Sequence, residues 1–174
     1  MASTIGRRFL RGIAIFLFGG LLGTAFGVAV GLFIFPYIFP PPIAAESLTE
    51  ADRSALVATG EFIHVDASDP IHYGKGKASV YEKTVFLEPD FEVGPGPAYH
   101  VYLVPKASIR GSADVGDTMY VDLGQLRAFK GSQRYAIPEG VDLGKYPSLV
   151  IWCERFSVLI SPADLKPVKT SSIR

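Results

Sequence analysis

The stretch Ser148-Leu-Val-Ile-Trp-Cys153 has the composition of a β-strand that lies in the core of a domain. It is apolar apart from its first residue and rich in the β-branched and aromatic side chains that strands favour. Because side chains alternate between the two faces of a strand, Leu149, Ile151 and Cys153 share one face. Val150, Trp152 and Glu154 point to the other. If the first face is the core, the Cys153 thiol is buried and chemically inert.

Further stretches of β-prone sequence lie on both sides of this segment, and turns that contain glycine or proline separate them. The predicted strands are residues 61–65, 77–81, 85–88, 99–104, 119–123, 133–137, 149–153 and 157–160. Short strands with no long helical pattern between them predict a mainly β fold, either an antiparallel β-sandwich or a barrel-like domain. We expect this domain to span residues 60–165, with a C-terminal tail over 166–174.

An uninterrupted apolar run precedes the domain, since no charged residue occurs between Arg11 and Glu46. A helix over residues 12–35 is about 36 Å long, and the hydrocarbon core of a bilayer is about 30 Å thick. Pro36 and the three prolines at 40–42 are expected to end this helix. The sequence therefore predicts one transmembrane helix that anchors the chain in the lipid bilayer.

Three basic residues, Arg7, Arg8 and Arg11, lie on the N-terminal side of the run. By the positive-inside rule, residues 1–11 are cytoplasmic and the C-terminal domain of this single-pass protein is periplasmic or extracellular. The run is longer than the apolar region of a cleaved signal peptide, but Ile43-Ala44-Ala45 resembles a cleavage site, so cleavage stays open. The arginines lack the spacing of a twin-arginine signal, and a basic flank is the simpler interpretation.

The linker over residues 36–59 is rich in proline and is predicted to end in a short spacer helix. Ser47-Leu-Thr-Glu50 fits a capping box, and residues 51–59 can form about two helical turns before Gly60. Within the apolar run, glycine recurs at every fourth residue and so forms a ridge on one helix face, a pattern that favours close helix packing and self-association. The ridge consists of Gly19, Gly23, Gly27 and Gly31.

The charge balance argues against a nucleic-acid partner. Three of the 17 basic residues precede the apolar run and all 17 acidic residues follow it. The remainder of the chain thus carries 14 basic and 17 acidic residues, a net charge of −3, with no concentrated basic surface.

Cys153 is the only cysteine, so it cannot form an internal disulfide, and a free thiol in a non-cytoplasmic, oxidising compartment is unusual. Of the three histidines, His72 precedes a glycine turn and His100 lies in a predicted strand. None has a metal-ligand spacing, and no residue behind Cys153 completes a blue-copper loop. Covalent c-type haem is excluded because no Cys-x-x-Cys-His is present, whereas noncovalent haem or a metal ion stays open, so the cofactor is unknown.

Two pairs of carboxylates are candidate oxygen ligands. Glu88 and Asp90 flank a proline, and Asp114 and Asp117 bracket a glycine loop, but neither pair matches a calcium-binding pattern, which favours solvated turn residues. No nucleophile elbow or phosphate-binding glycine loop occurs. The sequence therefore contains no complete enzymatic active site.

Four segments, in order, resemble one family. They are Gly60-Glu-Phe with Ile71-His-Tyr-Gly-Lys-Gly-Lys-Ala78; Phe91-Glu-Val-Gly-Pro-Gly-Pro-Ala-Tyr-His-Val-Tyr-Leu103; Leu123-Gly-Gln-Leu with Gly131-Ser-Gln-Arg-Tyr-Ala-Ile-Pro138; and Tyr146-Pro-Ser-Leu-Val-Ile-Trp-Cys-Glu-Arg-Phe156. Together they resemble the DM-thirteen domain, also called electron-transfer DM. One departure is Ala98, which stands where the family usually has an acidic residue.

The resemblance implies a β-rich extracellular or periplasmic module with a redox role. That role would fall on Cys153, as a bare thiol or as ligand to a prosthetic group, and His72 and His100 fall where family members often have histidine. The first hypothesis is thus a membrane-tethered electron-transfer module with an unknown redox partner. The alternative is a non-catalytic binding or structural module in which Cys153 is inert.

Overall fold

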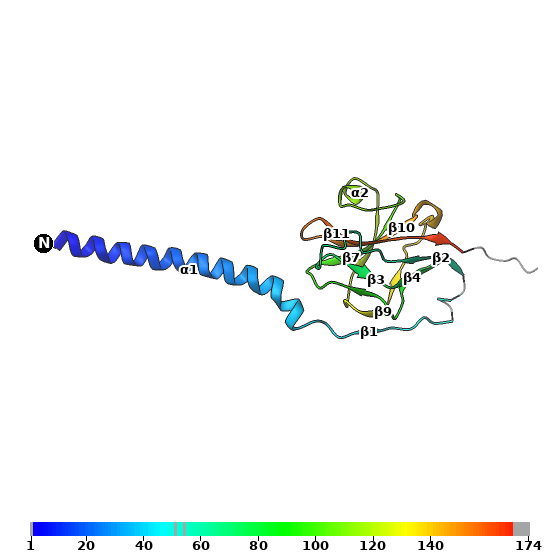
Figure 1. Cartoon of the computed structure of the whole chain (residues 1–174), viewed down its shortest axis with the longest axis horizontal. Coiled ribbons are helices and arrows are strands. Elements are labelled where there is room, and N and C mark those ends of the chain that lie inside the picture. Colours follow the sequence, from blue (N-terminus) through cyan, green and yellow to red (C-terminus); the bar gives the residue numbers. More distant parts are fainter. Residues whose placement is uncertain (1, 51, 54, 169–174) are drawn as a thin grey trace, which may run out of the picture. The chain divides into compact units, whose positions relative to one another are not determined.

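The computed structural model describes residues 2–50, 52, 53 and 55–168. The chain divides into two compact units, residues 1–39 and 40–174. The first is a single helix and the second is a β domain, drawn in Figure 1. The prediction of a mainly β fold preceded by an N-terminal helix is confirmed.

Helix α1 runs from Ala2 to Ile38. Its segment Gly6–Ile38 has a mean hydropathy of 2.2, and the helix is long and apolar enough to cross a membrane. It extends beyond the predicted 12–35 on both sides, and Pro36 lies inside it. A proline so near the end removes one backbone hydrogen bond, and the helix stops before the prolines at 40–42. A Cβ atom added at Gly19, Gly23, Gly27 or Gly31 would meet no other group within 4 Å.

The linker docks along the β domain through a two-residue strand, β1 (Ala44–Ala45), which pairs in parallel with β9. In place of the predicted spacer helix, residues 56–59 belong to a strand; Ala51 and Ser54 lie outside the described residues. The capping interaction lies further along the chain than predicted. The backbone N–H of Thr49 donates to Oδ2 of Asp52, and the backbone N–H of Asp52 donates to the side-chain oxygen of Thr49. Pairing with two neighbouring strands then outweighs the weak local helix preference.

Two main sheets and one small sheet build the domain. The six-stranded sheet has the order β1-β9-β5-β4-β2-β12, the four-stranded sheet β11-β10-β7-β8, and a small one pairs β3 with β6. The bounds are β2 Leu56–Glu61, β3 Gly74–Lys75, β4 Lys77–Tyr81, β5 Thr84–Leu87, β6 Glu92–Val93, β7 Tyr99–Val104, β8 Val121–Gln125, β9 Gly131–Ala136, β10 Ser148–Cys153, β11 Val158–Asp164 and β12 Lys166–Pro167, with a helical turn α2 at Ala113–Gly116 and a 3₁₀ turn at Leu143–Lys145.

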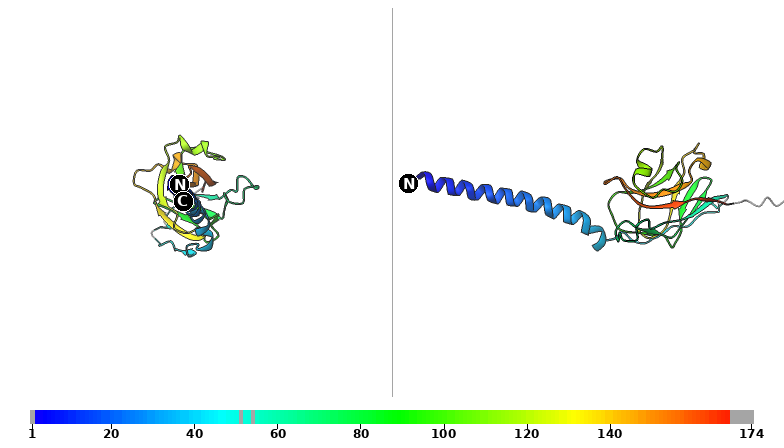
Figure 2. Two further views of the ribbon diagram at one scale, coloured as in Figure 1. Left: turned by 90° about the vertical axis from the view of Figure 1, so that its left-hand side faces the viewer. Right: turned by 45° about the horizontal axis from the view of Figure 1, so that its top comes forward.

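The two main sheets pack face to face around one core, to which both contribute side chains (Figure 1 and Figure 2). Val80 and Leu87 come from the six-stranded sheet, and Leu103 and Ile151 from the four-stranded sheet. This is the sandwich alternative of the predicted fold; among the described strands no sheet closes into a barrel.

A second, smaller core covers the outer face of the four-stranded sheet. It comprises Tyr102, Val104, Ile109, Val115, Val150, Trp152 and Leu159. Ile109 and Val115 belong to the loop that connects β7 to β8 and contains α2. The four-stranded sheet is therefore buried on both faces, which explains why every residue of β10 is buried.

Most predicted strands are present, and two have the predicted bounds, β4 and β7. The strand predicted over 61–65 is wrong, because only Glu61 belongs to a strand there and Phe62 makes one isolated bridge to Ala163. The two-residue strands were not predicted, since a pair of residues carries no periodic pattern.

Gly76 lies between β3 and β4 with φ +93°, and a Cβ added there would collide with the backbone of Asp90. We expect Gly76→Ala to lower the free energy of unfolding by about 3 kcal/mol, because left-handed strain and steric overlap add. The matched control is Gly140→Ala, since Gly140 has φ +82° and open space around it. It should cost about 1 kcal/mol. Thermal melts of the full chain in detergent measure both, and equal melting temperatures would contradict the steric argument.

Self-association through the glycine ridge stays a prediction. Gly23→Leu should lower the dimer fraction of the full chain in detergent, as measured by cross-linking, because the larger side chain keeps a second helix at a distance. Ala25→Leu is the control: it lies at nearly the same depth, about 200° around the helix from Gly23. Equal effects of the two substitutions, or none, would show that the ridge is not a packing surface.

Candidate functional site

Cys153, the last residue of β10, lies in the main core with 2% of its surface exposed. Its Sγ donates a hydrogen bond to the carbonyl oxygen of Pro97 at 3.3 Å. Burial raises the pKa of the Cys153 thiol, outweighing the backbone N–H groups of Phe156 and Arg155, which favour the thiolate. The thiol is thus neutral at neutral pH and shielded from solvent.

His100 lies on the opposite face of the same sheet. Strands β7 and β10 pair antiparallel with Trp152 opposite His100 and Cys153 opposite Tyr99. Tyr99 and Cys153 face the main core, whereas Trp152 belongs to the outer cluster. The sheet therefore separates the imidazole of His100 from the thiol, and the structure does not bring these two predicted residues together.

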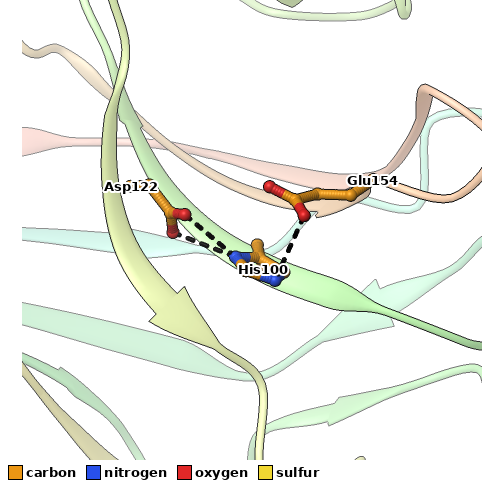
Figure 3. Close-up of side chains that lie close together, drawn as sticks. All are labelled: His100, Asp122 and Glu154. Carbon is orange, nitrogen blue, oxygen red and sulfur yellow. Dashed lines mark hydrogen bonds and ion pairs between the residues drawn. The ribbon is translucent and has the colours of Figure 1, made fainter.

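On that outer face, three residues from distant parts of the sequence meet. His100 comes from β7, Asp122 from β8, and Glu154 directly follows β10. The Nδ1 atom of His100 lies 3.0 Å from Oδ2 and 3.1 Å from Oδ1 of Asp122. Its Nε2 atom lies 3.4 Å from Oε2 of Glu154. Figure 3 shows the imidazole held between the two carboxylates. Ligand atoms of the three residues lie within 4.8 Å of one another, close enough to be considered for a metal ion.

A buried tyrosine extends this group into the outer cluster. The hydroxyl of Tyr102 donates to Oε1 of Glu154 at 2.6 Å, and the ring stacks on Tyr120 with 4.2 Å between centroids. Burial, and then the hydrogen bond to Glu154, raise the pKa of Tyr102 far above its ordinary value. Tyr102 therefore stays protonated and acts as a permanent donor to Glu154.

His72 lies elsewhere, in the loop before β3. Its Nδ1 atom is 2.7 Å from Oδ2 of Asp69. The backbone N–H of His72, then its side chain and the backbone N–H of Ile71, lower the pKa of Asp69 to about 2. This pair lines a hollow of about 190 Å³ that also contains Arg110. His72 is thus joined neither to Cys153 nor to His100 by any contact among the described residues.

The other carboxylates singled out from sequence, where they make contacts, support turns. Glu88 accepts a hydrogen bond from Ser79 at 2.6 Å, and Asp90 accepts one from the backbone N–H of Lys77. Asp114 accepts from Lys106 and from two backbone N–H groups, and the Lys106 contact is the main reason its pKa falls to about 2. These contacts order loops, as expected for turn residues.

Sequence reasoning missed Asp122 and Glu154 as partners of His100, and it missed the ion pairs that fix the linker. Glu46 of the linker binds Arg127 at 2.8 Å, and Asp52 binds Arg134 at 3.0 Å. No short sequence motif indicates either group, because the residues that bond each other are at least 22 residues apart in sequence. Alternation placed Glu154 on the Trp152 face, which was the one available signal.

Comparison with known proteins agrees with the resemblance found in the sequence. The model of the family described as Electron transfer DM13 matches residues 66–165, which cover most of the β domain, including Cys153 and the group formed by His100, Asp122 and Glu154. No curated protein and no solved structure matches the chain. Because the matched region is more than half of the chain, this protein belongs to the Electron transfer DM13 family.

Proposed function

We propose that this chain is a membrane-anchored electron-transfer module whose β domain lies outside the cytoplasm, in the periplasm or at the cell surface. The observation that carries the proposal is the family match over residues 66–165. The anchor is supported by the apolar segment Gly6–Ile38. Its orientation is supported by Arg7, Arg8 and Arg11 on the N-terminal side, with all acidic residues on the other.

Cys153 is the residue that this proposal assigns to the redox role, and its surroundings limit how it can act. Reaction as a bare thiol requires the thiolate and access from solvent, and burial opposes both. A haem or metal ion bound at Sγ would have to displace packed core side chains or the Pro97 carbonyl group. The closed domain therefore does not fit a prosthetic group at this sulfur, and reaction of the thiol with a partner requires the packing around Cys153 to open.

A non-catalytic binding or structural module is the second candidate function. The observation that favours it is the burial of Cys153, which is 2% exposed and lies among apolar core side chains. In this case the thiol contributes packing alone, as buried free cysteines commonly do. Cys153→Ala would then leave the function of the protein in cells intact.

Thiol reactivity tests the bare-thiol route. We expect Cys153 in the folded chain to react with a disulfide reagent at pH 8 at least about 100-fold more slowly than an exposed thiol, because its raised pKa and its burial act together. The control is the double variant Cys153→Ser, Ala107→Cys, which carries one thiol at an exposed loop position. Denaturant should make the two rates equal. A fast native reaction would restore the bare thiol as the redox group.

A spectrum and a metal analysis test the electron-transfer proposal itself. The full chain, purified in detergent from membranes, should carry a visible chromophore or a redox-active metal, or give a reversible wave at an electrode. Loss of that signal in Cys153→Ser, with an unchanged melting temperature, would assign it to Cys153. Its persistence in Cys153→Ser would place the redox centre elsewhere. A colourless, metal-free chain with no wave would contradict the proposal and favour the second candidate function.

Orientation is tested by labelling cells with a thiol reagent that does not cross membranes. The Cys153→Ser, Ala107→Cys chain should be labelled in intact cells or spheroplasts, because the positive-inside rule places the domain outside. Cys153→Ser, Ser3→Cys is the matched control and should be labelled once the membrane is opened. The reverse pattern would show that the β domain is cytoplasmic.

A further inference from the structure

The outer face of the four-stranded sheet holds an imidazole between two carboxylates, and its geometry suits a metal ion better than it suits two hydrogen bonds. We propose that His100 and Glu154 bind a divalent transition-metal ion of the Zn²⁺ type, with Asp122 as the residue that positions the imidazole. This proposal goes beyond electron transfer, because the site can be filled by an ion that stays in one oxidation state. It also involves neither Cys153 nor the main core.

The two ring nitrogens of His100 have different surroundings. Both oxygens of Asp122 lie within 3.1 Å of Nδ1, so the carboxylate accepts the Nδ1–H hydrogen bond and fixes the proton on that nitrogen. Nε2 then presents its lone pair to the side where Glu154 lies. A carboxylate that holds one nitrogen of a histidine while the other binds metal is a common arrangement in metal sites.

The separation of the proposed ligand atoms fits an ion. Nε2 of His100 and Oε2 of Glu154 are 3.4 Å apart, which is long for a hydrogen bond between a nitrogen and a carboxylate. Two ligand atoms that each lie about 2.1 Å from a tetrahedrally coordinated ion are about 3.4 Å apart. An ion can thus bind between these atoms with little movement of either side chain.

Glu154 is held in place from two sides. Its Oε1 atom accepts the hydrogen bond from Tyr102, whose side chain is buried and stacked on Tyr120. Its backbone N–H donates to the carbonyl oxygen of Ala98 at 3.0 Å. One carboxylate oxygen is therefore bound by a rigid donor, and the other is directed toward His100. Such preorganisation lowers the entropic cost of binding an ion.

Charge and exposure also favour a cation. Asp122 and Glu154 place two carboxylate groups around one imidazole, and carboxylate oxygens attract cations. The side chains of these two acids are 39% and 44% exposed, so an ion can enter and water can complete its coordination. Imidazole together with carboxylate is a donor set for Zn²⁺ and its first-row neighbours, whereas Ca²⁺ and Mg²⁺ prefer oxygen ligands alone.

Titration with Zn²⁺ by isothermal calorimetry tests the proposal. The full chain in detergent, purified without a polyhistidine tag and freed of metal by a chelator, should bind one Zn²⁺ at pH 7.5 with micromolar affinity. His100→Ala and Glu154→Gln should each weaken binding at least about 30-fold. Asp122→Asn should weaken it by about 10-fold to 100-fold, the range for loss of a group that orients a ligand. His64→Ala, which removes a histidine that hydrogen-bonds Asp69 in another loop, should leave binding unchanged.

A spectroscopic measurement keeps the proposal testable if a variant fails to fold. Cu²⁺ bound to the unmodified chain should show hyperfine coupling to a single imidazole nitrogen by electron paramagnetic resonance, and Glu154→Gln should alter that spectrum. The proposal is overturned if no Zn²⁺ binds. It is equally overturned if folded His100→Ala and Glu154→Gln chains bind as tightly as the unmodified chain. Neither outcome bears on electron transfer by Cys153, which the spectrum of the Cys153→Ser chain tests separately.

Discussion

The antiparallel pairing of β7 with β10 fixes both the core and the candidate sites of this domain. Its register places Cys153 opposite Tyr99 and Trp152 opposite His100. Because side chains alternate along each strand, this register decides which groups face the main core and which face the outer cluster. A shift of one residue would place Cys153 and His100 on the same face, so that either the thiol would leave the main core or the imidazole would enter it. The apolar residues on both faces of β10 make such a shift costly, since each set packs against its own cluster.

Burial of the four-stranded sheet on both sides also explains the polar contacts on its outer face. The loop that carries α2 covers Tyr102 and Val150, so polar atoms beneath it require partners within the protein. The hydroxyl of Tyr102 finds Glu154, and the hydroxyl of Ser148 donates to the carbonyl oxygen of Lys106 at 2.7 Å. The same constraint that stabilises the sheet therefore orients Glu154 beside His100.

The strands could be predicted from sequence where alternation or a continuous apolar run was long enough to register, as in β4, β7 and β10. The linker could not, because Leu56–Glu61 pairs with two strands distant in sequence, and that pairing overrides a local helix signal. The burial of Cys153 stayed open in the sequence, because both faces of residues 148–153 carry large apolar side chains and alternation alone does not show which face meets the main core. The grouping of His100 with Asp122 and Glu154 could not be foreseen, since it depends on the register of three strands, and a single sequence does not contain that information.

The residue to which the family resemblance assigns the redox role, Cys153, is not among the residues that the domain exposes to solvent. The family description points to electron transfer, and the resemblance assigns that role to a cysteine that the core of this chain encloses. The groups that solvent reaches lie on the other face, around His100. Opening of the hairpin between β10 and β11 is one movement that would loosen the packing around Cys153, and it would also displace Glu154, which begins the turn. An ion held by His100 and Glu154 would resist this opening, because it would tie the turn to β7. Metal binding on the outer face and exposure of the thiol on the inner face would then oppose each other through the same hairpin.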